Sequence, residues 1–135
     1  MERDALTRAD IFCYAKEHFG SEPEYLWART PESAVLRHAD NRKWYAIVMP
    51  VERAHLGLPG EGVFDVLNLK CDPALVGALR TRPGFLPAYH MNKERWITLL
   101  LDGPVSREEG FQLLEMSYEL TKQKMKKASG KQKQP

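Results

Sequence analysis

Apolar residues recur three or four positions apart near both ends of the chain, a pattern typical of helices that pack one face on a sheet. The first run predicts a helix that begins at Thr7, whose hydroxyl can cap free backbone N–H groups, and ends at Gly20. The last run follows Ser106 and Glu109, whose spacing predicts a capping box. A short helix is predicted over residues 73–81, which begin with a proline. The backbone N–H that proline lacks would have no hydrogen-bond partner in the first turn of a helix, so proline is favoured there.

Between these helices, runs rich in β-branched and aromatic residues predict strands over residues 33–38, 44–49, 63–70 and 96–101. Residues 39–43 contain an Asp-Asn pair that tolerates left-handed backbone angles, so the first two strands should form a hairpin. Residues 82–87, with two prolines and a glycine, are predicted to be a turn or loop. Tight turns join antiparallel strands. The pattern therefore predicts an α+β fold, with an antiparallel sheet of about five strands covered by two to three helices.

Length and composition fit one domain. With 43% hydrophobic and 28% charged residues, the 135-residue chain has the balance of a globular protein. We predict a single domain over residues 1–127 and a disordered basic tail over residues 128–135. Cys13 and Cys71 have no second cysteine at ligand spacing, which indicates a reduced compartment. Without an apolar run of about 20 residues or a signal-peptide pattern, we expect a cytoplasmic protein with no membrane partner.

The formal net charge of +2 depends on the C-terminal end. Six lysines follow Thr121: Lys122, Lys124, Lys126, Lys127, Lys131 and Lys133. Without them, 14 basic side chains stand against 18 acidic ones, a formal charge of −4. Any affinity for a polyanion must therefore come from the tail or from a local patch.

No catalytic or metal-binding pattern is present in the sequence. The histidines never stand four residues apart with an acidic partner, as a zinc-binding helix would require: His18, His38, His55 and His90. The glycines of residues 57–62 lack the order of a nucleotide-binding loop. No nucleophile or paired carboxylate accompanies the histidine and lysine of residues 89–93. We therefore expect no metal, no cofactor and no enzymatic activity.

Several short segments resemble the signature of the MmcQ/YjbR family: LPAYHMNK (86–93), RWIT (95–98), LDG (101–103) and SYELT (117–121). Upstream, KWYA (43–46) and LKCD (69–72) occur in the family's order and spacing. The resemblance covers roughly residues 5–125 and implies an antiparallel sheet packed by helices, similar to secretion-chaperone-like folds. It implies no established enzymatic activity. The family is labelled DNA-binding because its hairpins have been likened to a pair of wings.

Carried over to this chain, the resemblance predicts a nucleic-acid-binding set: Arg42, Lys43, His90, Asn92, Lys93 and Arg95. Lysine and arginine supply the sequence-independent, phosphate-directed part of such binding. A structural interpretation stays open for the same residues. His90 and Asn92 are suited to satisfy backbone groups where the chain enters a strand, and charged residues at a hairpin protect a strand edge from aggregation.

Aromatic side chains near these residues offer a surface on which bases could stack: Trp27, Trp44, Tyr45, Trp96 and Tyr118. Their aliphatic neighbours favour core packing for Trp96 and Tyr118, whereas Trp44 follows Lys43 and stays open. Two functions follow from the sequence. The first is DNA binding through the basic hairpin and the HMNK segment. The alternative, favoured by the acidic body, is a protein-interaction or chaperone-like adaptor that holds a protein partner.

Overall fold

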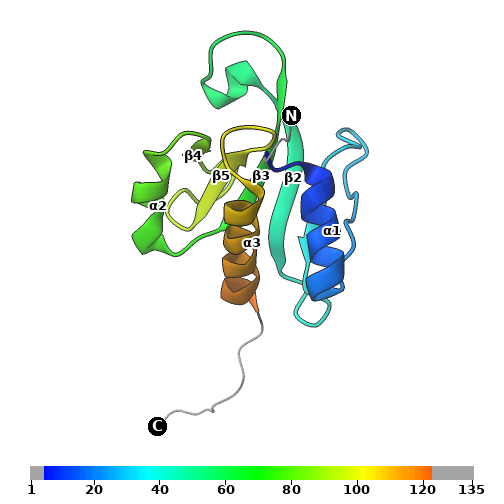
Figure 1. Cartoon of the computed structure of the whole chain (residues 1–135). Coiled ribbons are helices and arrows are strands. Elements are labelled where there is room, and N and C mark those ends of the chain that lie inside the picture. The colour runs from blue at the N-terminus through cyan, green and yellow to red at the C-terminus, as the bar shows by residue number, and fades with distance from the viewer. Residues whose placement is uncertain (1–4, 123–135) are drawn as a thin grey trace.

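The computed structural model describes residues 5–122, which form three α-helices, one 3-10 helix and five strands (Figure 1). In chain order these are α1 (Arg8–Phe19), β1 (Ala34–Arg37), β2 (Trp44–Glu52), η1 (Arg53–Leu56), β3 (Val63–Lys70), α2 (Pro73–Arg80), β4 (Phe85–Pro87), β5 (Trp96–Leu100) and α3 (Arg107–Thr121). The predicted tail, residues 128–135, and five of the six lysines that follow Thr121 lie outside the described residues. No helix among residues 5–122 has the length and apolar character to cross a membrane.

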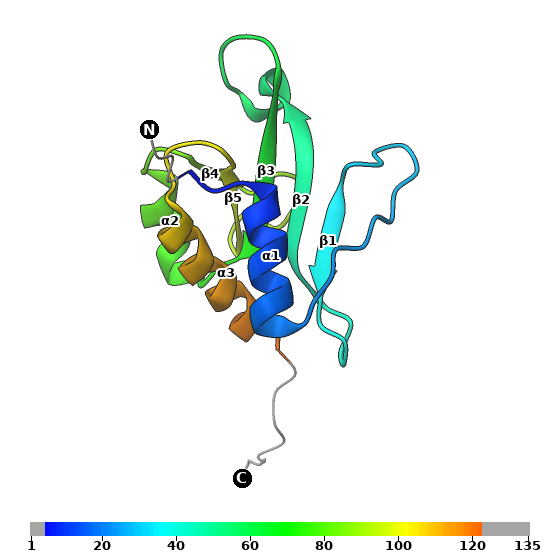
Figure 2. The same cartoon turned by 45° about the vertical axis from the view of Figure 1, so that its right-hand side comes forward.

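The strands form one sheet in the order β1-β2-β3-β5-β4, and every neighbouring pair is antiparallel. The three α-helices lie together on one side of it (Figure 2). Alternate strand residues such as Leu67, Leu69 and Ile97 join Leu114 of α3 in one buried cluster on that side. The predicted α+β fold is confirmed.

The opposite side of the sheet, here called the open face, carries no α-helix. A smaller buried cluster of Val51, Val66 and Leu100 lies there, with Tyr89 packed against it. Asn68 and Thr98 lie on the same face, because their neighbours along the strands, Leu67, Leu69, Ile97 and Leu99, belong to the helix-side cluster. Loops and the 3-10 helix η1, whose Leu56 packs against this cluster, therefore cover the open face.

The local signals that predicted the helix ends are largely confirmed. Thr7 and Asp10 form a reciprocal capping box, and Gly20 ends α1 with a left-handed φ of 69°. At α3 only half of the predicted capping box forms. Ser106 Oγ accepts from the Glu109 backbone N–H at 3.2 Å, but the Glu109 carboxylate pairs with the guanidinium of Arg82 instead of returning to Ser106. This ion pair lowers the pKa of Glu109.

The prediction that residues 82–87 form only a turn or loop is wrong. Phe85–Pro87 is strand β4, paired with β5, and the Phe85 side chain is buried. Proline is tolerated here because β4 is the last strand of the sheet, where one row of N–H groups has no partner strand. The prolines and glycine of residues 82–87, which predicted a turn, are therefore also compatible with a short edge strand.

Candidate nucleic-acid interface

Three connections meet at one end of the sheet, the lower end in Figure 1. Ala46 of β2 pairs with Leu69 of β3, which pairs with Ile97 of β5, so β2 and β5 begin where β3 ends. The turn before β2 carries Arg42 and Lys43, and the segment before β5 carries Lys93 and Arg95. Only β3 separates these strands, so their ends lie about 10 Å apart at the usual strand spacing. The structure thus brings both predicted basic segments to one end of the sheet.

Sequence reasoning missed a further cation at this end. Lys70 is the last residue of β3, between the two predicted segments. Its ammonium lies 5.9 Å from the ring centroid of Trp96. We call the following set the basic end: Arg42, Lys43, Lys70, Lys93 and Arg95. Among residues 5–122, none of these five side chains forms an ion pair with a carboxylate.

The β1–β2 turn is anchored to the end of α3 by Asn41. The Asn41 side-chain amide donates to the carbonyl of Thr121 at 2.9 Å, and its Oδ1 accepts from the backbone N–H of Lys43 at 2.8 Å. Arg42 has a left-handed φ of 65°, a conformation that the turn requires. Arg42 and Lys43 are both exposed, so the anchored turn presents two cations at fixed backbone positions.

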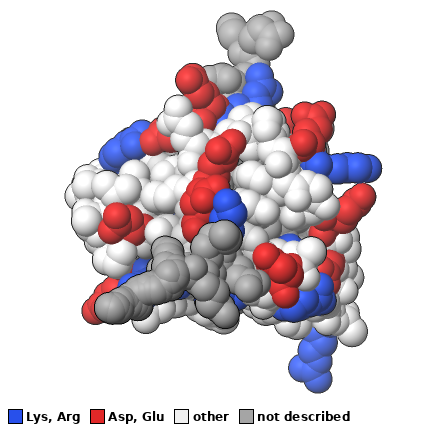
Figure 3. All heavy atoms as spheres, turned by 90° about the horizontal axis from the view of Figure 1, so that it is seen from below, with Lys and Arg blue, Asp and Glu red and all other residues white. Residues whose placement is uncertain are grey.

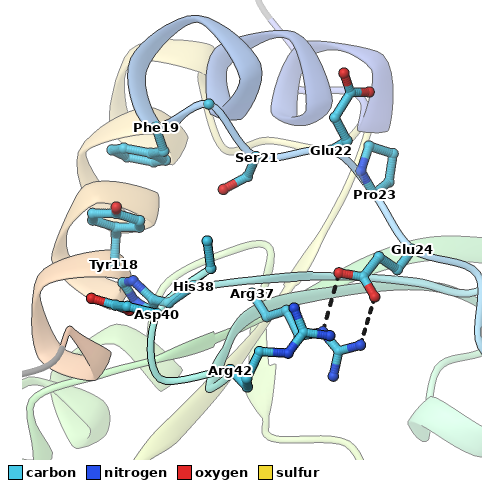
Figure 4. A pocket seen from close by; sticks show the side chains of 12 residues that line it. Phe19, Ser21, Glu22, Pro23, Glu24, Arg37, His38, Asp40, Arg42 and Tyr118 are labelled. Atoms are coloured by element: carbon cyan, nitrogen blue, oxygen red, sulfur yellow. Dashed lines mark hydrogen bonds and ion pairs between the residues drawn. The ribbon is translucent and has the colours of Figure 1, made fainter.

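Arg42 also lines a pocket of about 430 Å³ between the end of α1 and the hairpin (Figure 4). Arg37 in the same pocket forms a two-pronged ion pair with Glu24, with one N–O distance of 2.6 Å. The Arg37 hydrogen bonds and, to a lesser degree, the charge of Arg42 lower the pKa of Glu24. Asp40 lines the pocket as well. The pocket therefore holds both signs of charge and favours neither an anion nor a cation.

The segment before β5 is folded onto the open face by a buried polar pair. The Tyr89 backbone N–H donates to Thr98 Oγ1 at 2.9 Å, and Asn68 Nδ2 donates to the Tyr89 carbonyl at 3.3 Å. The Thr98 hydroxyl in turn donates to Asn68 Oδ1. Asn68 and Thr98 are fully buried. These contacts hold Tyr89 and, with it, the exposed His90 over the sheet.

The structure separates the roles of His90 and Asn92. The side-chain Oδ1 of Asn92 accepts a hydrogen bond from the backbone N–H of Glu94 at 2.9 Å. The backbone carbonyl of Asn92 accepts one from the backbone N–H of Trp96 at 3.0 Å. Asn92 therefore makes the backbone contacts that the structural interpretation expects. His90 forms no side-chain hydrogen bond within residues 5–122. Its ring stacks on Tyr89 at a centroid distance of 4.0 Å and faces a different cavity from that of Arg42.

Of the two aromatic residues expected in the core, only Tyr118 packs there. Tyr118 stacks on Phe19 at 4.0 Å beside the helix-side cluster, as predicted. The prediction for Trp96 is wrong: this residue is half-buried and lies on the open face, because β5 turns the alternate residues Ile97 and Leu99 toward the helices. Trp27 and Trp44 are also half-buried and meet edge to face at 5.7 Å.

Charge at this end of the molecule is mixed. Seen from below, basic and acidic side chains are interspersed among uncharged ones, and the described residues visible in this view form no continuous basic strip (Figure 3). Asp40, Asp72 and Glu94 neighbour the basic end along the chain. The cations are therefore close together but separated by carboxylates, an arrangement that supports weak phosphate binding better than tight binding.

Comparison with known proteins identifies the family. The YjbR family model matches residues 17–120, from the last turn of α1 almost to the end of α3. This chain belongs to the YjbR family. The resemblance deduced from the sequence is confirmed, and the basic end lies within the matched region.

Relatives of this YjbR-family chain share its fold. The uncharacterised protein YyaQ of Bacillus subtilis is 46% identical over 117 residues, which cover 87% of this chain and 99% of YyaQ. The crystal structure of a Pseudomonas syringae protein is 44% identical, with a TM-score of 0.84 over 87% of this chain and 100% of that one. A Deinococcus radiodurans protein is 27% identical, with a TM-score of 0.68 over 95% and 88% of the two chains.

The hairpin of this YjbR-family chain should loosen in acid. His38 is buried, its Nε2 lies 2.8 Å from Thr121 Oγ1, and burial lowers its pKa despite the nearby Asp40 charge. Because the unfolded chain then binds this proton more readily, stability should fall as the pH drops below about 6.5, the ordinary pKa of histidine. Urea unfolding at pH 7.5 and pH 5 measures this. His38→Gln should show a shallower loss; an equal loss in both proteins would contradict the prediction.

Proposed function

We propose that this YjbR-family protein binds nucleic acid through phosphate contacts made by the basic end. The observation that carries the proposal is the convergence of five cations, none of them in an ion pair with a carboxylate of residues 5–122, at the ends of three adjacent strands. Unpaired lysines and arginines release the counterions condensed on a nucleic acid when they neutralise its phosphates. In this proposal Asn92 positions its neighbours and does not itself contact the ligand.

The spacing of the basic end suits a phosphate backbone. The starts of β2 and β5 lie about 10 Å apart, with Lys70 between them, and each strand of a duplex carries one phosphate per 3.4 Å or so of helix axis. A short stretch of backbone can therefore reach all three places. Both turns are held by side-chain amides, Asn41 in one and Asn92 in the other, so little ordering is needed on binding.

Affinity should be modest. The body of the chain up to Thr121 carries a formal charge of −4, and carboxylates are interspersed with the cations at this end (Figure 3). We expect dissociation constants of about 10⁻⁴ to 10⁻⁶ M at physiological salt, the usual range of non-specific binding. Affinity should rise steeply at low salt, with a log–log slope of about −3.5 to −4.5 if all five contacts form.

The test is a fluorescence anisotropy titration of a labelled oligonucleotide at several salt concentrations. Lys70→Gln with Lys93→Gln should lower the affinity at 50 mM salt about tenfold or more and reduce the slope by about 1.4–1.8, since two phosphate contacts are lost. The matched control is Arg53→Gln with Arg80→Gln, since Arg53 follows the far end of β2, Arg80 ends α2, and neither belongs to the basic end. Each double variant loses two cations, and in each one of the two lies over an aromatic ring. Lys70 lies over Trp96 in the test variant, and Arg53 lies over Phe64 in the control.

Two outcomes would reject the proposal. A wild-type protein that does not bind, or that binds without salt dependence, has no phosphate interface of this kind, and the protein-interaction adaptor would then be the better prediction. Equal losses in the two double variants would show that binding follows net charge and not the basic end. A loss confined to the Lys70 and Lys93 variant supports the proposal.

A further inference from the structure

A second cavity lies on the open face of the sheet and has a different character from the pocket at Arg42. Its volume is about 370 Å³, and Met49 and Val51 of β2 contribute apolar lining. Aromatic rings also line it, among them those of Trp27, Tyr89 and His90. Cavities of about 300–1,000 Å³ with aromatic linings are typical of small-ligand sites. We call this cavity the aromatic groove.

The few polar groups of the aromatic groove suit a heteroaromatic ligand. The hydroxyls of Thr30 and Ser33 and the side chains of Glu52 and His55 are also part of the lining. Hydroxyl, carboxylate and imidazole groups can bind the donors and acceptors on the edge of a ring, while aromatic side chains bind its faces. A planar ring with polar edges therefore matches the groove better than an aliphatic chain does.

The groove is within reach of the basic end along the same face. Met49 pairs with Val66, and Lys70 follows four residues further along β3, or about 13 Å at the rise of a strand. The segment 88–95 joins the two places directly, since His90 lines the groove and Lys93 and Arg95 belong to the basic end. A backbone held at the basic end can thus deliver one of its bases to the groove.

We infer that the nucleic acid is bound as a single strand, with one unpaired base in the aromatic groove. The inference rests on the proposed function and names its ligand class. In a duplex the bases are stacked and paired inside the helix, and flipping one out costs a few kcal/mol, whereas a single strand offers its bases directly to a side-chain ring while its phosphates contact lysines. The cations of the basic end complement the negative charge of the phosphates, and the aromatic groove complements the uncharged base.

The test compares three fluorescein-labelled probes on the full-length chain at 20 mM salt: a 15-nucleotide thymidine strand, an abasic strand of equal length, and a 15-base-pair duplex. The thymidine strand should bind about 5- to 150-fold more tightly than the abasic strand, the range expected for stacking one base. It should also bind more tightly than the duplex. The two single strands carry the same backbone charge, so the difference between their affinities measures the contribution of the bases.

Variants then locate the base. Trp27→Leu should bring the thymidine strand close to the affinity of the abasic strand, whose own affinity should not change. His90→Gly removes the exposed ring and accepts the φ of 61° without strain, so it repeats the test with little risk to folding. Tyr25→Leu is the control, because Tyr25 is 55% exposed and does not line the groove. It should change neither affinity.

The outcomes distinguish this inference from the proposed function. Equal binding of the thymidine and abasic strands, or tighter binding of the duplex, would overturn the inference and leave phosphate binding by the basic end intact. No binding of any probe would reject the proposed function itself. If the thymidine preference exists but is unchanged in a folded His90→Gly protein and in Trp27→Leu, the base lies elsewhere and the inference is wrong.

Discussion

Replacing Gly110 by alanine is expected to lower the free energy of unfolding by about 1–3 kcal/mol, the usual cost of overpacking a core. A Cβ atom at Gly110 would overlap Leu6 Cδ2 and lie 3.2 Å from Leu6 Cδ1 and Cγ. Leu6 is fully buried and belongs to the helix-side cluster, so its side chain has little room to move. The N-terminal arm before α1 is therefore packed directly on the backbone of α3.

The same substitution at Gly77 of α2 is the matched control. Nothing lies within 4 Å of a Cβ atom built there, so Gly77→Ala should stabilise the protein by about 0.5–1 kcal/mol through helix propensity alone. Urea unfolding of both variants checks the opposite signs. Two variants that are both more stable than wild type would show that the arm yields to the new methyl group. Adding Leu6→Ala to Gly110→Ala should remove most of the interaction between the two sites.

Local structure followed from local signals in this chain. The ends of α1 depend on Thr7, Asp10 and Gly20, which act through hydrogen bonds and backbone angles within a few residues of themselves. Strand β3 was predicted with its observed bounds because residues 63–70 combine apolar and β-branched side chains between a glycine-rich loop and a proline. Such features need no knowledge of the rest of the fold.

Features that depend on tertiary structure were predicted less well. Strand β4 was missed because a proline is compatible with a strand only at a sheet edge, and strand order is not encoded locally. Glu109 was expected to cap α3, but Arg82, 27 residues away, provides a charged partner. Trp96 was assigned to the core because its hydrophobic neighbours hid the fact that alternate residues of β5 face opposite sides.

In the candidate site, too, some features could be predicted from local sequence and others depend on the tertiary fold. The family resemblance gave the two basic segments, and strand pairing explains why they meet. Lys70 could have been found from the end of the predicted strand at residue 70, had the order of the strands been known. The aromatic groove could not, because its lining comes from three separate stretches of the chain, which contain Trp27, residues 49–55 and His90. The folding of residues 88–95 over the open face brings Tyr89 and His90 to this lining.

That folded segment leads to the last prediction. Thr98→Val should lower the free energy of unfolding by about 2–6 kcal/mol, because it leaves Asn68 Oδ1 and the Tyr89 N–H without their partner, at about 1–3 kcal/mol for each unsatisfied buried group. Thr98→Ser keeps the hydroxyl and removes one methyl group, so it should cost only about 1 kcal/mol. Valine and threonine have nearly the same shape, which makes the hydroxyl the main difference between them.

Hydrogen exchange of the Tyr89 amide gives an independent measurement. In wild type this N–H should be protected by Thr98, and in Thr98→Val its protection should fall while that of the β3 amides changes only with global stability. The same loosening should weaken binding of the thymidine strand, because His90 and Tyr89 would no longer be held at the groove. If valine and serine at position 98 gave equal stability and equal protection, the buried hydroxyl would not be what fixes the segment, and the groove would depend on the packing of Tyr89 against Val66 and Leu100 alone.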